Sequence, residues 1–513
     1  MSCLSTCIKP IIRFPSVKVH GHNVGICATI RYKMNTSIFN EKPTLAYDTV
    51  CLERSILTWL HKATPAFPVD GSKITIIYDP SEFYNSLLTE CKTAKMRITL
   101  ASLYLGSGKL EKELVNSIKQ TMFSSNGSVK VNILLDYNRG SRGKINSKRI
   151  LAPLLNNKFT FCCNIFLYHT PRLRGFLKAL IPYRFNEIIG LQHMKLYLFD
   201  NTLIISGANL SNDYFCNRQD RYFLIKDCKD LCDFYCSLVE RVTEFSFQLQ
   251  PDGSTIYSNK IQSHPLNSSK KKFAAEASIK IKKLFQQEIN KRLELKEKDM
   301  PKTDTWIFPL VQMGQLNIRH DSEIILYLLK NASLGATLRM ATGYFNLTSE
   351  YRKAILNTCQ ANCHLLIAHP RANGFFGAKG IASGIPAAYT TIEESFFKMC
   401  EKFSQSERVQ LWEFLKHGWT YHAKGLWYSL PGDQKPCFTL IGSSNFGYRS
   451  VDRDLETQIA LLTKNKDLQD SLQKEYERLF NCAIPVTKMT FAQKERIPPT
   501  WVRLVAYLFR YYF

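Results

Sequence analysis

Apolar runs of strand length alternate with helical patterns along this chain, and the same order occurs twice. The segment 96–118, MRITLASLYLGSGKLEKELVNSI, predicts a strand, a Gly/Ser turn and an amphipathic helix, and 336–356, ATLRMATGYFNLTSEYRKAIL, repeats that order. The next apolar runs, VKVNILLDYNRG and CHLLIAHPRANG, each enter a basic loop that contains glycine. This pattern predicts an α/β fold with an internal duplication, in which each half is an α/β/α sandwich.

Length and charge narrow the class of protein. With 513 residues, 45% of them hydrophobic, the chain can bury two or more cores, which excludes a small disulfide-stapled scaffold and wholesale disorder. The net charge of +25 predicts acidic partners: nucleic acid, anionic lipid or phosphorylated substrates. The 16 cysteines have no metal-ligand spacing, so we expect reduced thiols and no metal site.

Composition also divides the chain into parts. The N-terminal part has Lys and Arg but no acid before Glu41, which is typical of a mitochondrial targeting segment or, alternatively, of a disordered basic N-terminus. No apolar run approaches the roughly 20 residues that span a bilayer. We predict a targeting segment at 1–45, a first domain at 46–251, a linker or charged insertion at 252–303, a second domain at 304–490 and an amphipathic C-terminal segment at 491–513.

Each repeat contains a histidine and a lysine two positions apart. These are His193 and Lys195 in LQHMKLYLFD, and His422 and Lys424 in YHAKGLWYS. Side chains two apart on a strand point to the same face, so each pair can present an imidazole and an ammonium to one phosphate group. A single such pair is common by chance, but two pairs at equivalent places in a repeat indicate a functional site.

An amide and a carboxylate follow each pair in matching register. Asn209 and Asp220 are separated by the same interval as Asn445 and Glu456. Before the asparagine the second repeat has a longer hairpin tip, PGDQKPC, whose proline and glycine are typical of a turn. Because a longer tip leaves the strands aligned, both repeats end with the same two functional groups.

The aspartate that follows the first pair has no counterpart in the second. Asp200 stands at a strand end before NTLII, whereas Ser429 occupies that position in the second repeat. An aspartate at a strand end starts a turn and can hold local backbone, so we interpret Asp200 as a structural member of the motif. The longer second hairpin removes the turn that such an aspartate would brace. We therefore interpret the second repeat as an intact half-site.

The paired motifs resemble those of the phospholipase D superfamily, whose two His-Lys-Asp motifs meet across a pseudo-twofold axis. Four longer stretches are similar to the eukaryotic mitochondrial phosphatidylglycerophosphate synthases, and this likeness covers nearly the whole chain after about residue 50. The resemblance implies two phospholipase D-like halves with the active site at their interface. The stretches are RGFLKALIPYRFNEIIGLQHMKLYLFD, SGANLSNDYFCNRQDRY, NGFFGAKGIASGIPAAY and IGSSNFGYRSVDRDLETQIA.

The resemblance also implies an activity, the transfer of a phosphatidyl group from CDP-diacylglycerol to glycerol 3-phosphate. CMP is released and phosphatidylglycerophosphate is formed, on the way to phosphatidylglycerol and cardiolipin. The implied partners are these two substrates and an anionic membrane surface, with no nucleic acid, and the implied location is the matrix side of the mitochondrial inner membrane. This chemistry requires no cofactor, although effects of a nucleotide or a divalent cation stay open.

By analogy with the superfamily, His193 is the nucleophile that forms a phosphohistidine and His422 is the general acid and base. The symmetry of the sequence leaves the reverse assignment open. Lys195 and Lys424 would neutralise the non-bridging phosphate oxygens.

The amides and carboxylates complete the implied site. Asn209 and Asn445 would donate hydrogen bonds to the phosphate oxygens, so that no metal is needed. Asp220 and Glu456 would each bond the second nitrogen of a histidine, fix its tautomer and favour its protonated form. An ordinary surface salt bridge is the alternative interpretation for these two acids.

The loop ASLYLGSG is a weaker candidate for contact with a nucleotide, because glycines let backbone amides approach phosphate. Its candidate residues are Ala101, Ser102, Gly106, Ser107 and Gly108. The loop lacks the spacing of a P-loop, and ATGYFNLT occupies the same place in the other repeat. We therefore prefer to interpret both as strand ends that line the substrate cleft.

Basic loops offer a further phosphate site. Arg139, Arg142 and Arg371 are candidates to hold the phosphate of glycerol 3-phosphate, with ordinary surface charge as an equal alternative. PRLRGFLKALIPYRF and PPTWVRLVAYLFRYYF mix apolar, aromatic and basic residues as interfacial segments do, or else pack in the core.

Two other functions remain open at this stage. A phosphodiesterase of the same superfamily would hydrolyse lipid or nucleic acid, since water can resolve the same phosphohistidine. A non-catalytic protein could keep the fold to bind anionic lipid or RNA, but both complete His-Lys pairs argue against it.

Overall fold

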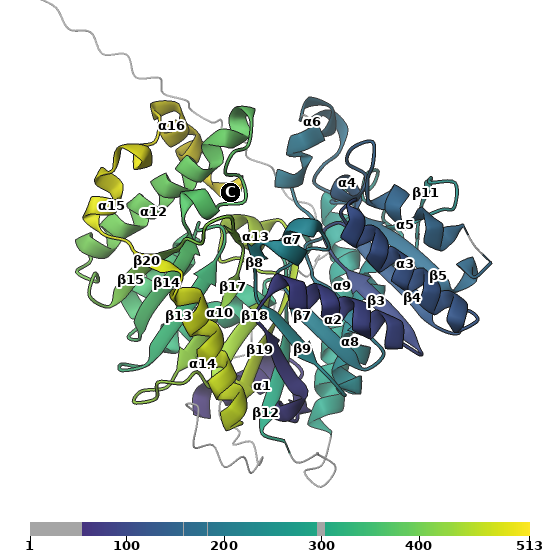
Figure 1. Ribbon diagram of the computed structural model, residues 1–513, viewed down its shortest axis with the longest axis horizontal. Coiled ribbons are helices and arrows are strands. Elements are labelled where there is room, and N and C mark those ends of the chain that lie inside the picture. The colour runs from purple at the N-terminus through teal and green to yellow at the C-terminus, as the bar shows by residue number, and fades with distance from the viewer. Residues whose placement is uncertain (1–53, 157, 182, 295–302, 513) are drawn as a thin grey trace, which may run out of the picture. The chain divides into compact units, whose positions relative to one another are not determined.

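The computed structural model describes residues 54–512, apart from 157, 182 and 295–302. The predicted targeting segment at 1–45 lies outside the described residues. The described part contains two mixed nine-stranded sheets, one for each repeat (Figure 1). This confirms the predicted α/β class and the duplication.

Eight strands follow the same order in both sheets, and each sheet has one additional edge strand, β11 in the first and β1 in the second. The first runs β11 (Thr255–Tyr257), β10 (Phe247–Leu249), β5 (Cys163–Tyr168), β4 (Lys130–Asp136), β3 (Arg97–Ala101), β6 (Leu196–Phe199), β7 (Thr202–Ser206), β9 (Tyr222–Ile225) and β2 (Ile74–Ile77). The second runs β20 (Ala483–Pro485), β15 (Val409–Phe414), β14 (Asn362–Ala368), β13 (Thr337–Thr342), β17 (Lys424–Ser429), β18 (Phe438–Gly442), β19 (Leu455–Thr463), β12 (Thr305–Met313) and β1 (Phe67–Val69). The three strands β3, β4 and β5 are mutually parallel, as are β13, β14 and β15. Each set continues into an antiparallel hairpin whose first strand begins just after Lys195 in β6 and at Lys424 in β17. The two histidines therefore lie just before these strands, whereas the sequence pattern predicts them on the strands.

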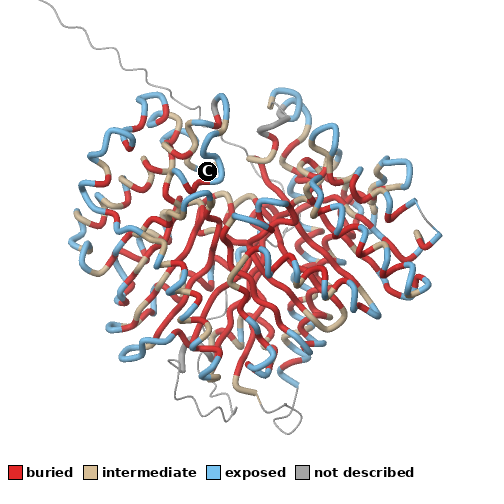
Figure 2. Tube along the Cα trace, in the orientation of Figure 1, coloured by how far each residue is buried: buried red, intermediate tan, exposed pale blue. Residues whose placement is uncertain are grey.

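Helices cover the sheets, and their apolar faces form three large cores. One core lies between the sheets and includes residues of α8, α9 and α14, while two others lie under α2, α3 and α5 and under α10 and α12. Figure 2 shows the strands as the most deeply buried part of the chain. The helices of the first repeat are α2 (Pro80–Thr93), α3 (Lys109–Ser124), α4 (Tyr137–Gly140), α5 (Ser147–Leu155), α6 (Gly175–Leu180), α7 (Asn212–Cys216) and α8 (Lys229–Thr243). The others are α1 (Arg54–Ala63), α9 (Lys270–Leu293), α10 (His320–Asn331), α11 (Ser349–Lys353), α12 (Ile385–Lys402), α13 (Tyr448–Asp452), α14 (Lys466–Phe480), α15 (Lys488–Ala492) and α16 (Thr500–Leu508).

The start of the predicted first domain belongs to the second sheet. Strand β1 pairs antiparallel with β12, and Leu60 of α1 is buried in the core of the second repeat. The first described residues therefore belong to the second sheet and its core, before β2 opens the first one, which the predicted boundary at residue 46 does not capture.

The predicted linker also differs from expectation. The segment 252–303 contains the 24-residue helix α9, in which Phe273, Ala277, Ile281 and Phe285 are buried in the core between the sheets. Its lysines lie on the opposite, solvated face. Because these lysines are interspersed among the apolar residues, the helical spacing of the apolar residues is hard to recognise in the sequence. The part Lys270–Leu293 is thus a packed helix rather than a linker.

The C-terminal segment ends in a helix that exposes much of its apolar surface. Val502 and Ala506 of α16 pack on Ala388 of α12, whereas Leu504 is 58% and Tyr507 75% exposed. In the described part of the chain, no helix combines the length and the apolar character needed to cross a bilayer.

Candidate active site

Each of the two predicted catalytic histidines is held by the backbone of the opposite repeat. The N–H of His193 donates to the carbonyl of Leu455 at 2.8 Å, and the N–H of His422 donates to the carbonyl of Gln219 at 2.8 Å. Leu455 and Gln219 are the residues just before the two predicted carboxylates. The two repeats therefore bring their motifs together at one place.

The side chains cross between the repeats in the same way. Nδ1 of His193 lies 2.9 Å from both carboxylate oxygens of Glu456, and Nδ1 of His422 lies 2.7 Å from Oδ2 of Asp220. Gly207 makes room for Asp220, since a Cβ there would lie 2.7 Å from its carboxylate. Because Nδ1 meets the carboxylate in both cases, Nε2 is the nitrogen left to react.

Both lysines are buried beside their histidines. Nζ of Lys195 donates to the carbonyl of His193 at 2.7 Å, and Nζ of Lys424 donates to that of His422 at 2.6 Å. Nζ of Lys424 also lies 2.6 Å from Nδ1 of His422, so it competes with Asp220 for that ring nitrogen. Since the two lysines are at most 1% exposed, solvent screens their charge little.

This environment favours neutral imidazoles. Burial lowers the pKa of His193 and His422 well below its usual value, and the ammonium groups of Lys195 and Lys424 lower it further. The expectation that the carboxylates favour protonated histidines is therefore reversed, because burial and the nearby positive charge outweigh them.

The partner groups are shifted toward neutrality as well. Burial raises the pKa of Glu456 to about 7 and that of Asp220 to about 6. Burial also lowers the pKa of Lys424 to about 8 and that of Lys195 well below its usual value. The resting site therefore holds several groups close to their titration points near neutral pH.

The two predicted asparagines differ in their hydrogen bonds. Oδ1 of Asn445 accepts a hydrogen bond from Oγ1 of Thr342 at 3.1 Å, which leaves the N–H groups of the amide as donors. Asn209 is buried, and among the described residues its Oδ1 has no hydrogen-bond partner. Ser102 is the counterpart of Thr342, and their hydroxyls donate to the carbonyls of Tyr104 and Tyr344, respectively.

Asp200 braces backbone away from the histidines. Its carboxylate accepts from the N–H groups of Lys95, Met96 and Arg97 at 2.7 to 2.9 Å, just before β3. Its φ is +50°, a conformation that aspartate tolerates better than most residues. The backbone it holds is thus the start of the neighbouring strand rather than its own hairpin.

Ser429 takes a different partner at the equivalent place. It lies opposite Thr337 at the start of β13, and its hydroxyl accepts a hydrogen bond from Arg339 at 3.0 Å. A serine is large enough for this contact, so the second repeat keeps its strand pairing without an aspartate.

The structure does not favour a phosphate loop at 101–108. Ala101 and Ser102 are fully buried, and the carboxylate of Glu111 lies against Gly106 and Gly108, where an added Cβ would be 2.2 and 2.6 Å from its oxygens. That carboxylate accepts from the N–H of Asn212 at 2.7 Å. Its negative charge opposes a phosphate at this position, and the exposed Ser107 belongs to the same loop.

Several residues near the histidines have no place in the predicted motifs. The Tyr214 hydroxyl lies 3.2 Å from Nε2 of His422, and the ring of Tyr344 lies 5.6 Å from the ring of the same histidine. Asp454 is buried beside His193 and accepts from the N–H of Leu191 at 3.0 Å. The sequence offers a sign of Tyr344, because Tyr104 occupies the equivalent position in the first repeat. Tyr214 and Asp454 follow the two asparagines but belong to no recognisable motif.

Three possible metal ligands also meet here. His193, Asp454 and Glu456 place ligand atoms within 4.8 Å of one another. The ammonium of Lys195 acts on the same carboxylate, and its charge opposes a divalent cation. We therefore keep the prediction that the reaction needs no metal ion, because the charge of Lys195 would repel one at this position.

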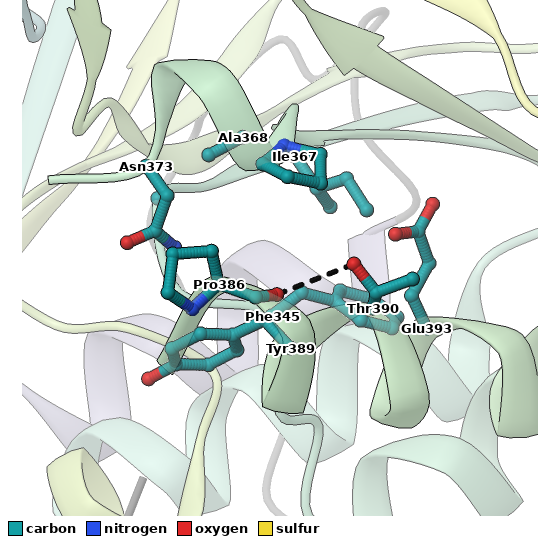
Figure 3. A pocket seen from close by; sticks show the side chains of 10 residues that line it. Phe345, Ile367, Ala368, Asn373, Pro386, Tyr389, Thr390 and Glu393 are labelled. Carbon is teal, nitrogen blue, oxygen red and sulfur yellow. Dashed lines mark hydrogen bonds between the residues drawn. The ribbon is translucent and has the colours of Figure 1, made fainter. Parts of the chain in front are cut away.

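A narrow cavity lies behind the second half of the site. Its walls include Phe345, Pro386 and Tyr389, and Glu393 lies at its edge (Figure 3). Burial raises the pKa of Glu393 well above its usual range, and the nearby carboxylate of Glu413 raises it further. Asn373 and Thr390 also line the cavity, so its wall is mixed, and among its lining residues no side chain carries a positive charge that would attract an anion.

Comparison with known proteins decides the family. The chain is 44% identical over 482 residues to the mitochondrial CDP-diacylglycerol–glycerol-3-phosphate 3-phosphatidyltransferase of Gallus gallus, covering 89% of this chain and 86% of that protein. The protein of the same name from Homo sapiens is 44% identical over 480 residues, with 89% and 85% covered. This chain belongs to the CDP-diacylglycerol–glycerol-3-phosphate 3-phosphatidyltransferase family.

More distant matches agree with this phosphatidyltransferase family. A probable member from Dictyostelium discoideum is 38% identical over 475 residues, covering 89% of this chain and 80% of that protein. A scan against protein-family models finds no match. Among solved structures, phosphatidylserine synthase of Haemophilus influenzae Rd KW20 has a TM-score of 0.66 at 19% identity, with 89% of this chain and 96% of that chain covered. That likeness supports the duplicated phospholipase D-like fold.

Proposed function

We propose that this enzyme transfers the phosphatidyl group of CDP-diacylglycerol to glycerol 3-phosphate, releasing CMP and forming phosphatidylglycerophosphate. The observation that carries the mechanism is the crossed pairing of His193 with Glu456 and of His422 with Asp220. Two imidazoles held in this way by opposite repeats suit a displacement in two steps at one phosphorus atom.

In the first step, Nε2 of His193 attacks the phosphorus that carries diacylglycerol. The N–P bond forms, the P–O bond to CMP breaks, and the leaving oxygen takes a proton from His422. The low pKa of His193 keeps its imidazole neutral before attack, as a nucleophile requires. Glu456 then stabilises the positive charge that develops on the ring.

In the second step, a hydroxyl of glycerol 3-phosphate attacks the phosphohistidine. His422 takes the hydroxyl proton, the new O–P bond forms, and the N–P bond to His193 breaks. Both histidines return to their starting state, so the reaction consumes no cofactor.

His422 must carry a proton in the first step although its resting pKa is low. The lipid pyrophosphate is anionic, and its charge offsets that of Lys424 and Lys195, which lower this pKa after burial. When a phosphate oxygen draws the Lys424 ammonium away from Nδ1, Asp220 alone holds that nitrogen. Substrate binding would thereby raise the pKa of His422 when protonation is needed.

The lysines and asparagines would stabilise the phosphoryl group itself. The Lys195 and Lys424 ammoniums are already desolvated, so their attraction for phosphate oxygens is strong. The amide N–H groups of Asn209 and Asn445 would add hydrogen bonds. This makes a cationic cradle from side chains alone.

The lipid substrate places the enzyme at a membrane. Exposed apolar residues on α6 and α16 include Phe176 at 78%, Leu504 at 58% and Tyr507 at 75%, and Figure 1 shows both helices at the top of the view, above α7 and α13. Together with the net charge of +25, they suit docking on an anionic bilayer. The relatives from Gallus gallus and Homo sapiens are named as mitochondrial, and on that basis we propose that this enzyme acts on the matrix side of the inner membrane.

Liposomes that contain CDP-diacylglycerol, mixed with labelled glycerol 3-phosphate, test the function. We expect labelled lipid and an equal amount of CMP from the wild type, and neither from His193→Ala. Phosphatidic acid without incorporated label would instead indicate a hydrolase. Equal incorporation by wild type and His193→Ala would refute the mechanism.

A further inference from the structure

A charge-swapped pair breaks the two-fold symmetry of the active site. Counted from the asparagine of each repeat, Asp213 and Arg218 stand at the same positions as Arg449 and Asp454. Each pair forms a salt bridge: Arg218 Nη2 lies 3.2 Å from Asp213 Oδ2, and Arg449 Nε lies 3.1 Å from Asp454 Oδ2. The base therefore occupies in one repeat the position that the acid occupies in the other.

Arg218 lies beside His422. Its guanidinium stacks over the ring of Tyr214 at 4.7 Å, and the hydroxyl of that tyrosine lies 3.2 Å from Nε2 of His422. Nε of Arg218 donates to Oγ1 of Thr420 at 3.0 Å. These contacts fix the plane of the guanidinium without occupying all five of its N–H groups.

The positive charge of Arg218 is only weakly balanced. Its side chain is 14% exposed, whereas that of Asp213 is 58% exposed, so solvent screens the partner more than the arginine. The guanidinium acts on His422 strongly enough to lower the pKa of that imidazole, after burial and Lys424.

The His193 side has the opposite character. Asp454 is 4% exposed and raises the pKa of His193 against the effect of burial. Arg449 is bound directly to this buried carboxylate, which balances its charge. An additional anion is therefore favoured beside His422 and not beside His193.

We propose that Arg218 binds a phosphate monoester on the His422 side of the site. Resting on the proposed function, this group is the phosphate of the incoming glycerol 3-phosphate, either alone or after that of the leaving CMP. Arg218 would thus be the residue that selects a phosphorylated acceptor over water or a neutral alcohol.

The geometry of displacement supports this position. In an in-line displacement the leaving group departs on the side opposite the nucleophile. In the second displacement the acceptor enters from that same side. With His193 as nucleophile, both phosphate monoesters come to the His422 side. The charge difference between the two sides thereby favours His193 as the nucleophile, a choice that sequence symmetry leaves open.

The basic loop of the first repeat is less suited to the same task. Arg142 Nη1 lies 2.6 Å from Oε1 of Glu187, and Arg139 Nη1 lies 3.7 Å from the same oxygen. The guanidinium of Arg139 also stacks over Tyr104 at 4.1 Å. A phosphate there would have to compete with a carboxylate that is only 21% exposed.

The test compares acceptors with and without a phosphate. Full-length Arg218→Gln, Arg218→Lys and wild type are assayed with CDP-diacylglycerol vesicles and either glycerol 3-phosphate or glycerol. A third arm follows exchange of labelled CMP into CDP-diacylglycerol without any acceptor. The matched control is Arg241→Gln. Arg241 lies on α8 and, like Arg218, forms a salt bridge with an acid of its own repeat, here Glu244.

We expect Arg218→Gln to raise KM for glycerol 3-phosphate at least tenfold, with much less effect on transfer to glycerol. Arg218→Lys should recover part of the loss, because it restores the charge but not the forked geometry. If Arg218→Gln also exchanges CMP more slowly, Arg218 binds the phosphates of both CMP and glycerol 3-phosphate. If its CMP exchange is unchanged, Arg218 binds only the phosphate of glycerol 3-phosphate.

Equal losses with glycerol 3-phosphate and glycerol would overturn the proposal, since a structural defect has no acceptor preference. If glycerol transfer is too slow to measure, a calorimetric Kd for glycerol 3-phosphate replaces that arm, and an unchanged Kd in Arg218→Gln overturns the proposal. A wild type that incorporates no glycerol 3-phosphate would refute the proposed function instead, so the two failures are distinguishable.

Discussion

Nδ1 of His193 lies 2.9 Å from both carboxylate oxygens of Glu456, which stands 263 positions further along the chain. His422 and Asp220 make the reciprocal contact in the opposite direction. Each half-site is therefore completed by the other repeat, because the carboxylate that holds each histidine comes from the opposite half of the chain.

Removing the charge of Glu456 should disable the nucleophile. Glu456→Gln keeps the shape, but it can bind either tautomer of His193 and cannot stabilise the developing imidazolium, so we expect kcat to fall by about 10²-fold or more. Steady-state assays with labelled glycerol 3-phosphate measure this, and circular dichroism checks the fold. A loss below about threefold would show that the carboxylate is dispensable.

The duplication and the site composition could be predicted because they leave local patterns. His193, Lys195 and Asn209 recur with their counterparts in one order, and the strands around them are continuous apolar runs. The crossing of partners could not be predicted, because the interval from Asn209 to Asp220 says nothing about which histidine the acid meets. That choice depends on how the repeats pack.

Two other features depend on tertiary packing in the same way. Strand β1 is only three residues long, and nothing in FPV shows that it pairs with Trp306 on the second sheet. In α9 the apolar positions Phe273 and Ile281 are hidden among lysines, so the net polarity of the segment favoured a linker. Burial also reversed the expected protonation of His422, since desolvation does not appear in a sequence pattern.

Asp200 should matter for stability rather than chemistry. Asp200→Ala removes acceptors from three backbone N–H groups and places alanine at a φ of +50°, so we expect a loss of about 2 to 4 kcal/mol in the free energy of unfolding. Denaturant unfolding measures this loss, while kcat at 25 °C should stay within about twofold. Ser429→Asp should change kcat just as little, and a large gain from it would show that the second half-site is impaired.

Activity should have a narrow pH optimum. Below about pH 7 Glu456 gains a proton and loses the charge that stabilises His193, and above about pH 8 Lys424 loses the proton that neutralises phosphate. We expect kcat/KM for CDP-diacylglycerol to fall about tenfold per pH unit on either side. Vesicle binding measured at each pH serves as the control, and a flat profile from pH 6 to 9.5 would contradict these assignments.

The exposed face of α16 should anchor the enzyme to vesicles. Leu504→Ser with Tyr507→Ser removes apolar surface that is 58% and 75% exposed, while Val502 and Ala506 still pack the helix on α12. We expect about tenfold weaker binding to anionic vesicles, with little change in unfolding temperature. Leu334→Ser is the matched control, because Leu334 is 78% exposed on the loop before β13. Cosedimentation measures binding, and activity on detergent-dispersed CDP-diacylglycerol should be nearly unchanged, because the catalytic residues are intact. Equal binding by the double variant and the control would show that α16 does not contact the membrane.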